Sequence, residues 1–244
     1  MFCKRLFMLL LPTLFLVGCG ADSVNDAKNA ATVYLNFQCD WQSVKQAFTP
    51  EQKEAWEDVS VEVASDFDDV LASLSDEMEQ IRQTTKIPTC QWQFPFKEEG
   101  VLTDISVVDT LKFMAQSLLV NARKSFSLKN QSEGINDILS DFRLTRQVGK
   151  IESITAKLIQ WEIEDSAIAL LMFYHEDFDA ELRNFLKNEL SQLLPTTSAV
   201  ETLAQEKEWF CYWIQKNFPP ENLEEYPFLE DFIAAIDKHP YFSM

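Results

Sequence analysis

The sequence predicts an all-α fold, with antiparallel helical hairpins stacked in an irregular bundle or solenoid. Apolar residues recur every three or four positions along most of the 244-residue chain, which is the spacing of one helical face. Only 5 glycines are present, so tight β-hairpin turns and glycine-rich phosphate loops are almost excluded. Short breaks separate the periodic segments, and helices joined by short connections pack as antiparallel neighbours.

Residues 27–85 are expected to form a long N-terminal hairpin of two helices. Its break is predicted at Thr49-Pro50, where Thr49 suits an N-cap, Pro50 the first helical position and Gln52 the capping box. Each helix has an apolar face: Ala27, Ala30, Tyr34, Phe37, Trp41, Val44 and Phe48, then Trp56, Val59, Val63, Phe67, Val70, Leu74, Met78 and Ile81. The second helix is otherwise strongly acidic, which is typical of a solvated face, with docking of a cationic partner as the alternative.

Residues 86–102 are expected to form an ordered crossover. Pro88 and Pro95 interrupt any helix, and Gly100 ends the segment. Three aromatic residues of this segment are expected to pack on the helical body: Trp92, Phe94 and Phe96.

Residues 103–244 predict a helical hairpin domain. Periodicity places its helices over about residues 108–126, 135–148, 151–172, 178–193, 200–214 and 227–238. The expected boundary residues are Thr103 as a cap, Gly149 as a C′ glycine, Pro195 as a stop, and Ser198 with Glu201 as a capping box. The residues expected to face the core from 151–172 are Ile151, Ile154, Leu158, Trp161, Ile168 and Met172.

The first 18 residues predict a secretory signal peptide. Lys4 and Arg5 precede an apolar run from Leu6 to Val17. That run is too short to cross a bilayer, which needs about 20 apolar residues, but it has the length and flanks of a secretory signal.

The stretch LVGC at residues 16–19 resembles the bacterial lipobox. By that resemblance the chain is cleaved before Cys19, the Cys19 thiol is lipidated, and residues 19–26 form a lipidated tether. An ordinary secretory signal is the alternative. Gly20 stands where an aspartate would retain a lipoprotein at the inner membrane, so the expected location is the outer membrane, facing the periplasm.

The charge of the processed chain bears on its partners. Without residues 1–18, 226 residues remain with 19 basic and 39 acidic side chains, a net charge of −20. Nucleic acid is excluded as a partner because no basic patch is available to neutralise phosphates. Adhesion to anionic lipid is disfavoured for the same reason, so the expected contact with the membrane is the lipid on Cys19.

Three further cysteines allow one disulfide in an oxidising periplasm. Cys39 and Cys90 are the possible pair that the sequence favours, because Cys211 lies on an apolar helical face and is expected to be a buried thiol.

Four stretches in order resemble a family of secreted or membrane-anchored helical proteins of planctomycetes and related bacteria. They are CQWQFPFKEEG, the helical pair LKFMAQSLLVNARKSFSLKNQSEGINDILSDFRLTRQVG, the helix IESITAKLIQWEIEDSAIALL, and LPTTSAVETLAQEKEWF. The resemblance covers roughly residues 86–215 and implies a helical fold; because the family has no established activity, it supplies no catalytic residues to transfer to this chain. Glu206-Lys207 departs from the Glu-Arg pair expected there, and lysine cannot make the bidentate contacts of arginine. Residues 103–193 also resemble tetratricopeptide-type hairpins, although no repeat of about 34 residues is present.

No catalytic, metal or cofactor site is predicted. His175 lies among the acids Glu176, Asp177, Asp179 and Glu181, but the second histidine of a zinc motif is missing, so a solvated helix start is expected. A second group of charged residues is expected to form a buried ion network that sets helix register, with a ligand groove as the alternative: Arg123, Asp141, Arg143, Arg146, Glu162 and Glu164.

Two functional hypotheses remain from these observations. The first is a lipid-anchored scaffold or protein-binding module of the cell envelope. The second is an enzyme or small-ligand carrier with a pocket lined by polar groups of the helices at 108–126, 135–148 and 151–172. A concave surface with buried, strongly perturbed acids would favour the second, and an extended groove without them would favour the first.

Overall fold

The computed structural model describes residues 29–58 and 67–218. They form 11 α-helices and two short 3₁₀ helices, without a strand. The predicted all-α class is therefore confirmed. The predicted signal peptide, the tether with Cys19 and the helix at 227–238 lie outside the described residues.

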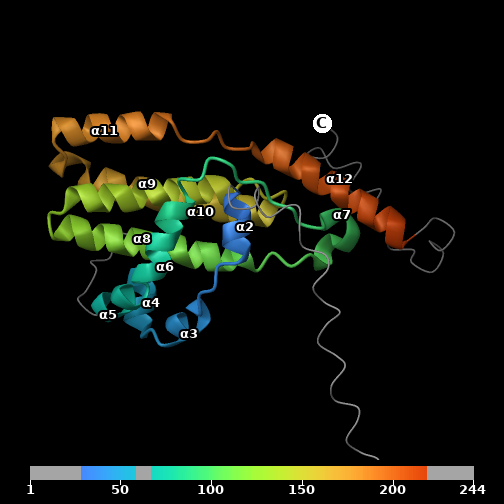
Figure 1. The fold of residues 1–244 in the computed structure, drawn as a ribbon, viewed down its shortest axis with the longest axis horizontal. Coiled ribbons are helices and arrows are strands. Elements are labelled where there is room, and N and C mark those ends of the chain that lie inside the picture. Colours follow the sequence, from blue (N-terminus) through green and yellow to red (C-terminus); the bar gives the residue numbers. More distant parts are fainter. Residues whose placement is uncertain (1–28, 59–66, 219–244) are drawn as a thin grey trace, which may run out of the picture.

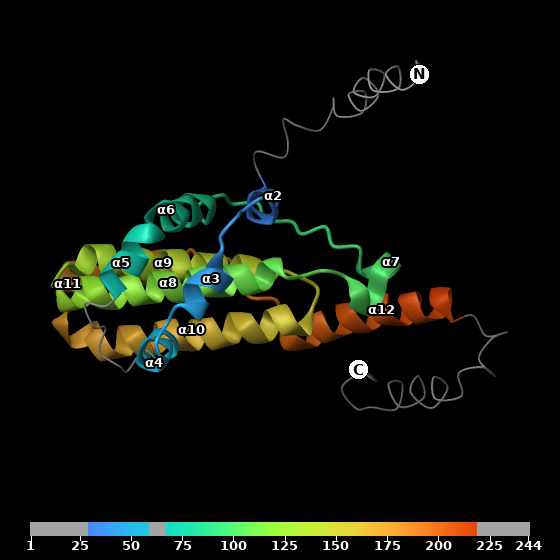
Figure 2. The ribbon, with the colours of Figure 1, turned by 90° about the horizontal axis from the view of Figure 1, so that it is seen from below.

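An antiparallel pair of long helices forms the centre of the fold. Helix α8 (Val107–Ser127) and helix α9 (Gln131–Val148) are joined by a short turn in which Lys129 adopts a positive φ of 60°. Helix α10 (Ile154–Tyr174) packs against both from one side. Helix α6 (Ser75–Thr84) packs against both from the other side, so α8 and α9 form the middle layer of the bundle (Figure 2).

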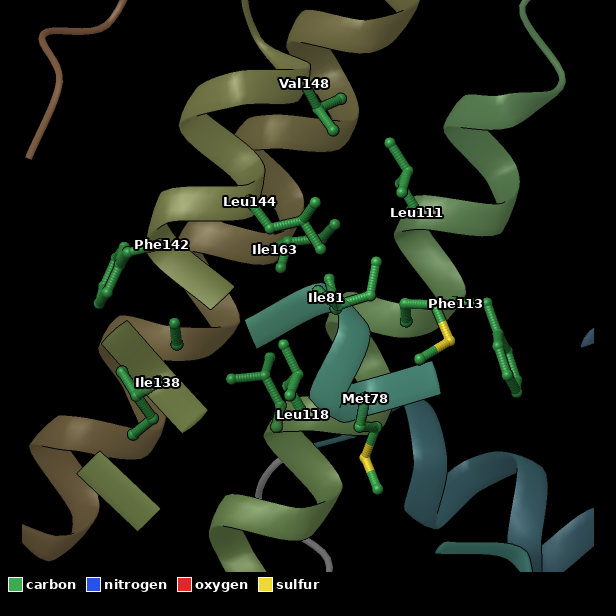
Figure 3. Packing of buried hydrophobic residues seen from close by; sticks show 14 of the residues in the cluster. Met78, Ile81, Leu111, Phe113, Leu118, Ile138, Phe142, Leu144, Val148 and Ile163 are labelled. Atoms are coloured by element: carbon green, nitrogen blue, oxygen red, sulfur yellow. The ribbon is translucent and has the colours of Figure 1, made fainter. Parts of the chain in front are cut away.

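The buried core lies where these helices meet. Leu111 and Leu118 of α8, Ile138 and Leu144 of α9, and Ile81 of α6 are all fully buried (Figure 3). Burial of an aliphatic side chain of this size stabilises the fold by about 1.5–3 kcal/mol, so this contact accounts for much of the stability of the three-layer arrangement.

The N-terminal region differs from the predicted hairpin of two long helices. It forms five short helices: α2 (Ala30–Leu35), α3 (Trp41–Gln46), α4 (Pro50–Glu57), α5 (Asp68–Ser73) and α6. Three side chains accept backbone hydrogen bonds as N-caps, namely Asn29, Asp40 and Thr49, and each begins a new helix. The prediction of two continuous helices was wrong: Asp40 begins α3 within the first, and the second is broken after α4, where Asp58 is extended, and at Leu74 between α5 and α6. The predicted capping box at Thr49 and Gln52 is confirmed.

An aromatic cluster holds these short helices on α8. The ring of Trp56 lies 4.9 Å from Phe48, 5.5 Å from Phe67 and 5.2 Å from Phe113 of α8, measured between centroids. Arg123 of α8 donates to the carbonyls of Ala55 and Asp58 at the C-terminal end of α4, where a cation is favourable. Burial lowers the pKa of Arg123 to about 10.

The predicted crossover is ordered, and its aromatic residues pack on the helices. After an extended stretch it forms α7 (Phe96–Glu99) and a 3₁₀ turn (Gly100–Leu102) beside α12 (Ala199–Asn217), as Figure 1 shows. Successive ring centroids lie 5.0–5.9 Å apart along one row: Tyr34, Trp92, Phe94, Phe96 and Trp209. Gly100 has a φ of 59°, and a Cβ there would meet the Trp213 ring, so both backbone and space require glycine.

Gln147 of α9 connects this crossover to α2. Its Oε1 accepts from the Tyr34 hydroxyl at 2.6 Å, its Nε2 donates to the Ile87 carbonyl at 3.0 Å, and its backbone carbonyl accepts from Trp92 Nε1 at 2.8 Å. Gln147 and Tyr34 are both buried, so these polar groups satisfy one another away from water.

Replacing Tyr34 by phenylalanine should lower the free energy of unfolding by about 1–2 kcal/mol, because the Gln147 oxygen loses its buried donor. Urea denaturation measures the change. Tyr212→Phe is the matched control, since Tyr212 is 49% exposed and should change stability by less than about 0.5 kcal/mol. Equal effects of the two substitutions would contradict the role assigned to the Tyr34–Gln147 hydrogen bond.

The remaining boundaries are partly as predicted. The capping box of Ser198 and Glu201 opens α12 as expected, and α11 (Ala180–Ser191) ends before Pro195. Thr103 does not cap α8, whose N-cap position is Ser106. Gly149 is the C-cap of α9 with an ordinary φ of −64° rather than a left-handed C′ residue, and it is needed because a Cβ there would collide with Gln160.

Candidate functional site

Helix α10 is turned so that the face predicted to be buried points outward. Leu158, Trp161, Ile168 and Met172 are 54%, 39%, 49% and 65% exposed, and the adjacent Phe173 is 71% exposed. We call these five residues the α10 stripe. The prediction that the first four face the core was therefore wrong.

The inward face of α10 is partly polar. Its buried residues are Ala156, Lys157, Gln160, Ile163, Glu164, Ala167 and Leu170. They also recur every three or four positions, so the helix carries two competing stripes. The small side chains of Ala156 and Ala167 allow α10 to approach α8 and α9 closely. Lys157 and Gln160 were not predicted as part of the network, although their spacing from Glu164 is the signal that could have found them.

A chain of hydrogen bonds satisfies the polar residues of this inward face. Lys157 Nζ donates to Gln160 Oε1 at 2.7 Å, and Gln160 Nε2 donates to Glu164 Oε1 at 2.7 Å. From α9, Arg146 Nε donates to the same Glu164 oxygen at 2.5 Å, and Arg146 Nη1 donates to the Leu194 carbonyl at 3.1 Å. This arrangement explains why α10 can bury its polar face, since each group has a partner.

The predicted ion network is only partly formed. Arg146 and Glu164 pair as part of it, but Arg143 pairs with Glu189 of α11 at 2.6 Å and Glu162 with Lys112 of α8 at 2.7 Å. Arg123 joins α8 to α4 instead. Five of the six residues therefore take part in separate helix contacts, Asp141 takes part in none of these pairs, and the six do not converge on one groove.

Asp141 of α9 lies in the core, and neither of its carboxylate oxygens has a hydrogen-bond partner among the described residues. Burial raises the pKa of Asp141 well above its usual value, and the charges of Glu164 and Asp137 raise it further. Its neighbour Asp137 accepts from Arg82 Nε and from Asn121 Nδ2, both at 2.6 Å. The pKa of Asp137 is also raised by burial, against the lowering effect of Arg82.

Two open hollows lie between α9 and α11. One of 590 Å³ is formed by the starts of both helices and includes Lys129, Asp179 and Phe185. The other, of 190 Å³, lies at the opposite ends of the two helices and includes Arg143 and Arg146. Asp141 and Glu164 line neither of them. The perturbed acid is thus buried inside the bundle rather than displayed in either hollow.

Cys39 and Cys90 are poor candidates for nucleophilic chemistry. Cys39 is half-buried and Cys90 is buried, and both are free cysteines in the structure. Burial raises the pKa of Cys39 to about 11 and that of Cys90 to about 12, which keeps both thiols protonated and unreactive at neutral pH. Their disulfide stays a prediction. Cys211 is half-buried on α12 rather than fully buried.

The acidic group around His175 has a structural role. His175 begins a 3₁₀ turn (His175–Asp177), and Asp179 is the N-cap of α11, accepting from the Leu182 backbone at 2.8 Å. Within residues 29–58 and 67–218, no three His, Cys, Asp or Glu side chains are placed to hold a metal ion. In the same part of the chain, no helix combines the length and apolarity that crossing a bilayer requires.

The structure therefore defines a class: an all-α bundle whose third long helix presents an apolar stripe outward. No family model, curated protein or solved structure matches the chain. The resemblance to the planctomycete family and to tetratricopeptide-type hairpins therefore stays a prediction.

Proposed function

We propose that this protein is a lipid-anchored, helical protein-binding module of a bacterial cell envelope. The observation that carries the proposal is the α10 stripe, five large apolar residues on the outer side of a well-packed helical layer. Contiguous apolar patches rimmed by polar residues mark interaction surfaces on soluble domains. Because α10 packs on α8 and α9 through its other face, the stripe is held on a rigid support.

The anchoring half of the proposal rests on the sequence around Cys19. Several acyl chains, each contributing about 0.8 kcal/mol per buried CH₂, would hold the chain on a membrane permanently. The outer membrane, facing the periplasm, is the proposed location. The strongly acidic chain offers no electrostatic substitute for the lipid.

Replacing Cys19 by serine should move the protein from the membrane fraction to the soluble fraction of the envelope, because the thioether can no longer form. Fractionation and mass spectrometry of the native protein measure this. Cys211→Ser, which removes another thiol, should leave the protein in the membrane fraction. An unmodified Cys19 thiol in the native protein would contradict the proposal.

An enzyme or small-ligand carrier is less well supported. Buried acids with raised pKa values are present among α8, α9 and α10, but neither hollow between α9 and α11 is lined by Asp141 or Glu164. A catalytic acid must reach its substrate within hydrogen-bond distance. The α10 stripe therefore favours the binding module.

Substitution of two residues of the α10 stripe should strongly reduce capture of the partner. Crosslinking in native envelopes, followed by purification of the protein, should yield a stoichiometric partner. The double substitution Ile168→Ser and Met172→Ser should lower the yield of that partner at least about tenfold. Phe185→Ser, at an exposed apolar residue of α11, is the matched control and should leave the yield unchanged. An equal yield with all three proteins would place the binding surface elsewhere.

A further inference from the structure

The chemistry of the α10 stripe indicates the kind of partner that it fits. Resting on the proposed function, we infer that the stripe receives an amphipathic helix of another protein, with a lysine or arginine at the centre of its apolar face. The inference joins two observations: the heptad spacing of the exposed apolar residues and the exposed carboxylate of Asp165 among them.

The spacing of the stripe suits a helix. Positions 158, 161, 165, 168 and 172 follow one another at intervals of three and four, the pattern of a coiled-coil seam. From Leu158 to Met172 the seam is about 21 Å long, or roughly four turns. A partner helix of similar length can pack its ridges along it.

Asp165 occupies the central position of this seam. A helix that covers the stripe removes Asp165 from water, and an ionised carboxylate buried without a partner is strongly unfavourable. A lysine or arginine opposite Asp165 would restore a charge-assisted hydrogen bond. The stripe therefore selects a partner by the position of one cation as well as by its apolar face.

No cation of α10 is available to neutralise Asp165 from within. Lys157, the only basic residue of α10, is fully buried and donates to Gln160. On the adjacent helix, Lys112 Nζ is paired with Glu162 at 2.7 Å. The local charge is thus acidic, in keeping with the net charge of −18 of the whole chain, which favours approach of a cationic partner.

Other occupants fit the charge less well. A second copy packed antiparallel about the centre of the seam would place Asp165 against Asp165. The chain's own residues 219–244 contain six acidic residues and a single lysine, Lys238. Anionic lipid would face the carboxylates of Glu162 and Asp165. Each of these three arrangements brings negative charge to negative charge.

The test uses the processed chain with Cys19→Ser and three synthetic helical peptides of about 18 residues, titrated by calorimetry in about 0.15 M salt. All three have the same leucine face. The first carries one lysine at the centre of that face, the second has the lysine moved to the polar face at equal net charge, and the third has glutamate at the central position. The first peptide should bind at least about tenfold more tightly than the second.

Charge reversal gives the sharpest result. Asp165→Lys should make the glutamate-centred peptide the preferred one, and Asp165→Asn should remove most of the preference. Ile168→Ser with Met172→Ser should weaken all three peptides. Because Asp165 is exposed, its substitutions should leave the thermal unfolding midpoint unchanged, which circular dichroism checks.

Several outcomes would overturn the inference. Equal binding of the first two peptides, or no effect of Asp165→Lys, would show only general attraction to an acidic protein. If removal of residues 219–244 raised the affinity for the peptide tenfold, the stripe would be the binding site of the chain's own tail. If the protein dimerised and the stripe substitution abolished dimerisation, the stripe would bind a second copy. If no peptide binds although the stripe substitution still abolishes crosslinking in envelopes, this inference fails while the proposed function stands.

Discussion

Replacing Arg146 by alanine should lower the free energy of unfolding by about 3–5 kcal/mol, the largest effect expected of any charged residue described above. Arg146 is the only guanidinium that contacts Glu164 in the described part of the chain, and it also donates to the Leu194 carbonyl beyond α11. Without it, the nearly buried Glu164 carboxylate keeps only the Gln160 amide as a hydrogen-bond donor, and the Leu194 carbonyl loses its bond to the guanidinium. Urea denaturation followed by circular dichroism measures the loss.

Arg143→Ala is the matched control for this prediction. Arg143 lies one turn earlier on α9 and pairs with Glu189 of α11, with both side chains 27% exposed. A pair so accessible to water contributes about 0–1 kcal/mol. Glu164→Gln should cost less than Arg146→Ala, since the amide oxygen still accepts from Arg146. Similar losses for Arg143→Ala and Arg146→Ala would contradict the central position given to the Arg146–Glu164 pair.

Replacing Asp141 by asparagine should stabilise the protein at pH 7 by about 1–3 kcal/mol. The pKa of Asp141 is raised in the folded state, whereas the unfolded chain ionises near pH 3.9. The contribution of Asp141 to stability is fully present below the unfolded pKa. It is then lost as pH rises toward the folded pKa, at about 1.4 kcal/mol per pH unit while only the unfolded state is ionised.

The difference in stability between wild type and Asp141→Asn isolates this effect from other titrating groups. Urea denaturation from pH 4 to pH 8 should show a difference that grows as pH rises above the unfolded pKa. A constant difference for Asp141→Asn would mean that the folded Asp141 ionises normally.

Local signals predicted the middle of the chain well. The helices at 108–126 and 135–148 were found nearly to their ends, and their short connection predicted the antiparallel pair of α8 and α9. The capping boxes at Thr49 and Ser198 were also correct. These features depend on interactions between residues three or four positions apart. Such local interactions set where a helix begins and which face it buries, so they can be predicted from the sequence alone.

The N-terminal helices were predicted too long because periodicity and caps gave conflicting signals. Asp40 can begin a helix, but polar residues also occur on the outer face of a continuous one. The aromatic contacts of Trp56 with Phe67 and Phe113 stabilise the segmented arrangement. Those contacts join residues distant in the chain, so no local pattern reports them.

The sequence by itself determined the helical class, the positions of most breaks, the acidic charge, and the expectation of a lipid on Cys19. Only the tertiary structure decided which face of α10 is buried. That helix carries an apolar stripe through Trp161 and a polar one through Gln160 at the same period, and hydrophobicity alone favours burying the first. Arg146 of α9 supplies the partner that makes burial of Glu164 possible. The small side chains of Ala156 and Ala167 let this face of α10 pack closely on α8 and α9. The apolar stripe is left outside for that reason, and it is there that we place the binding surface.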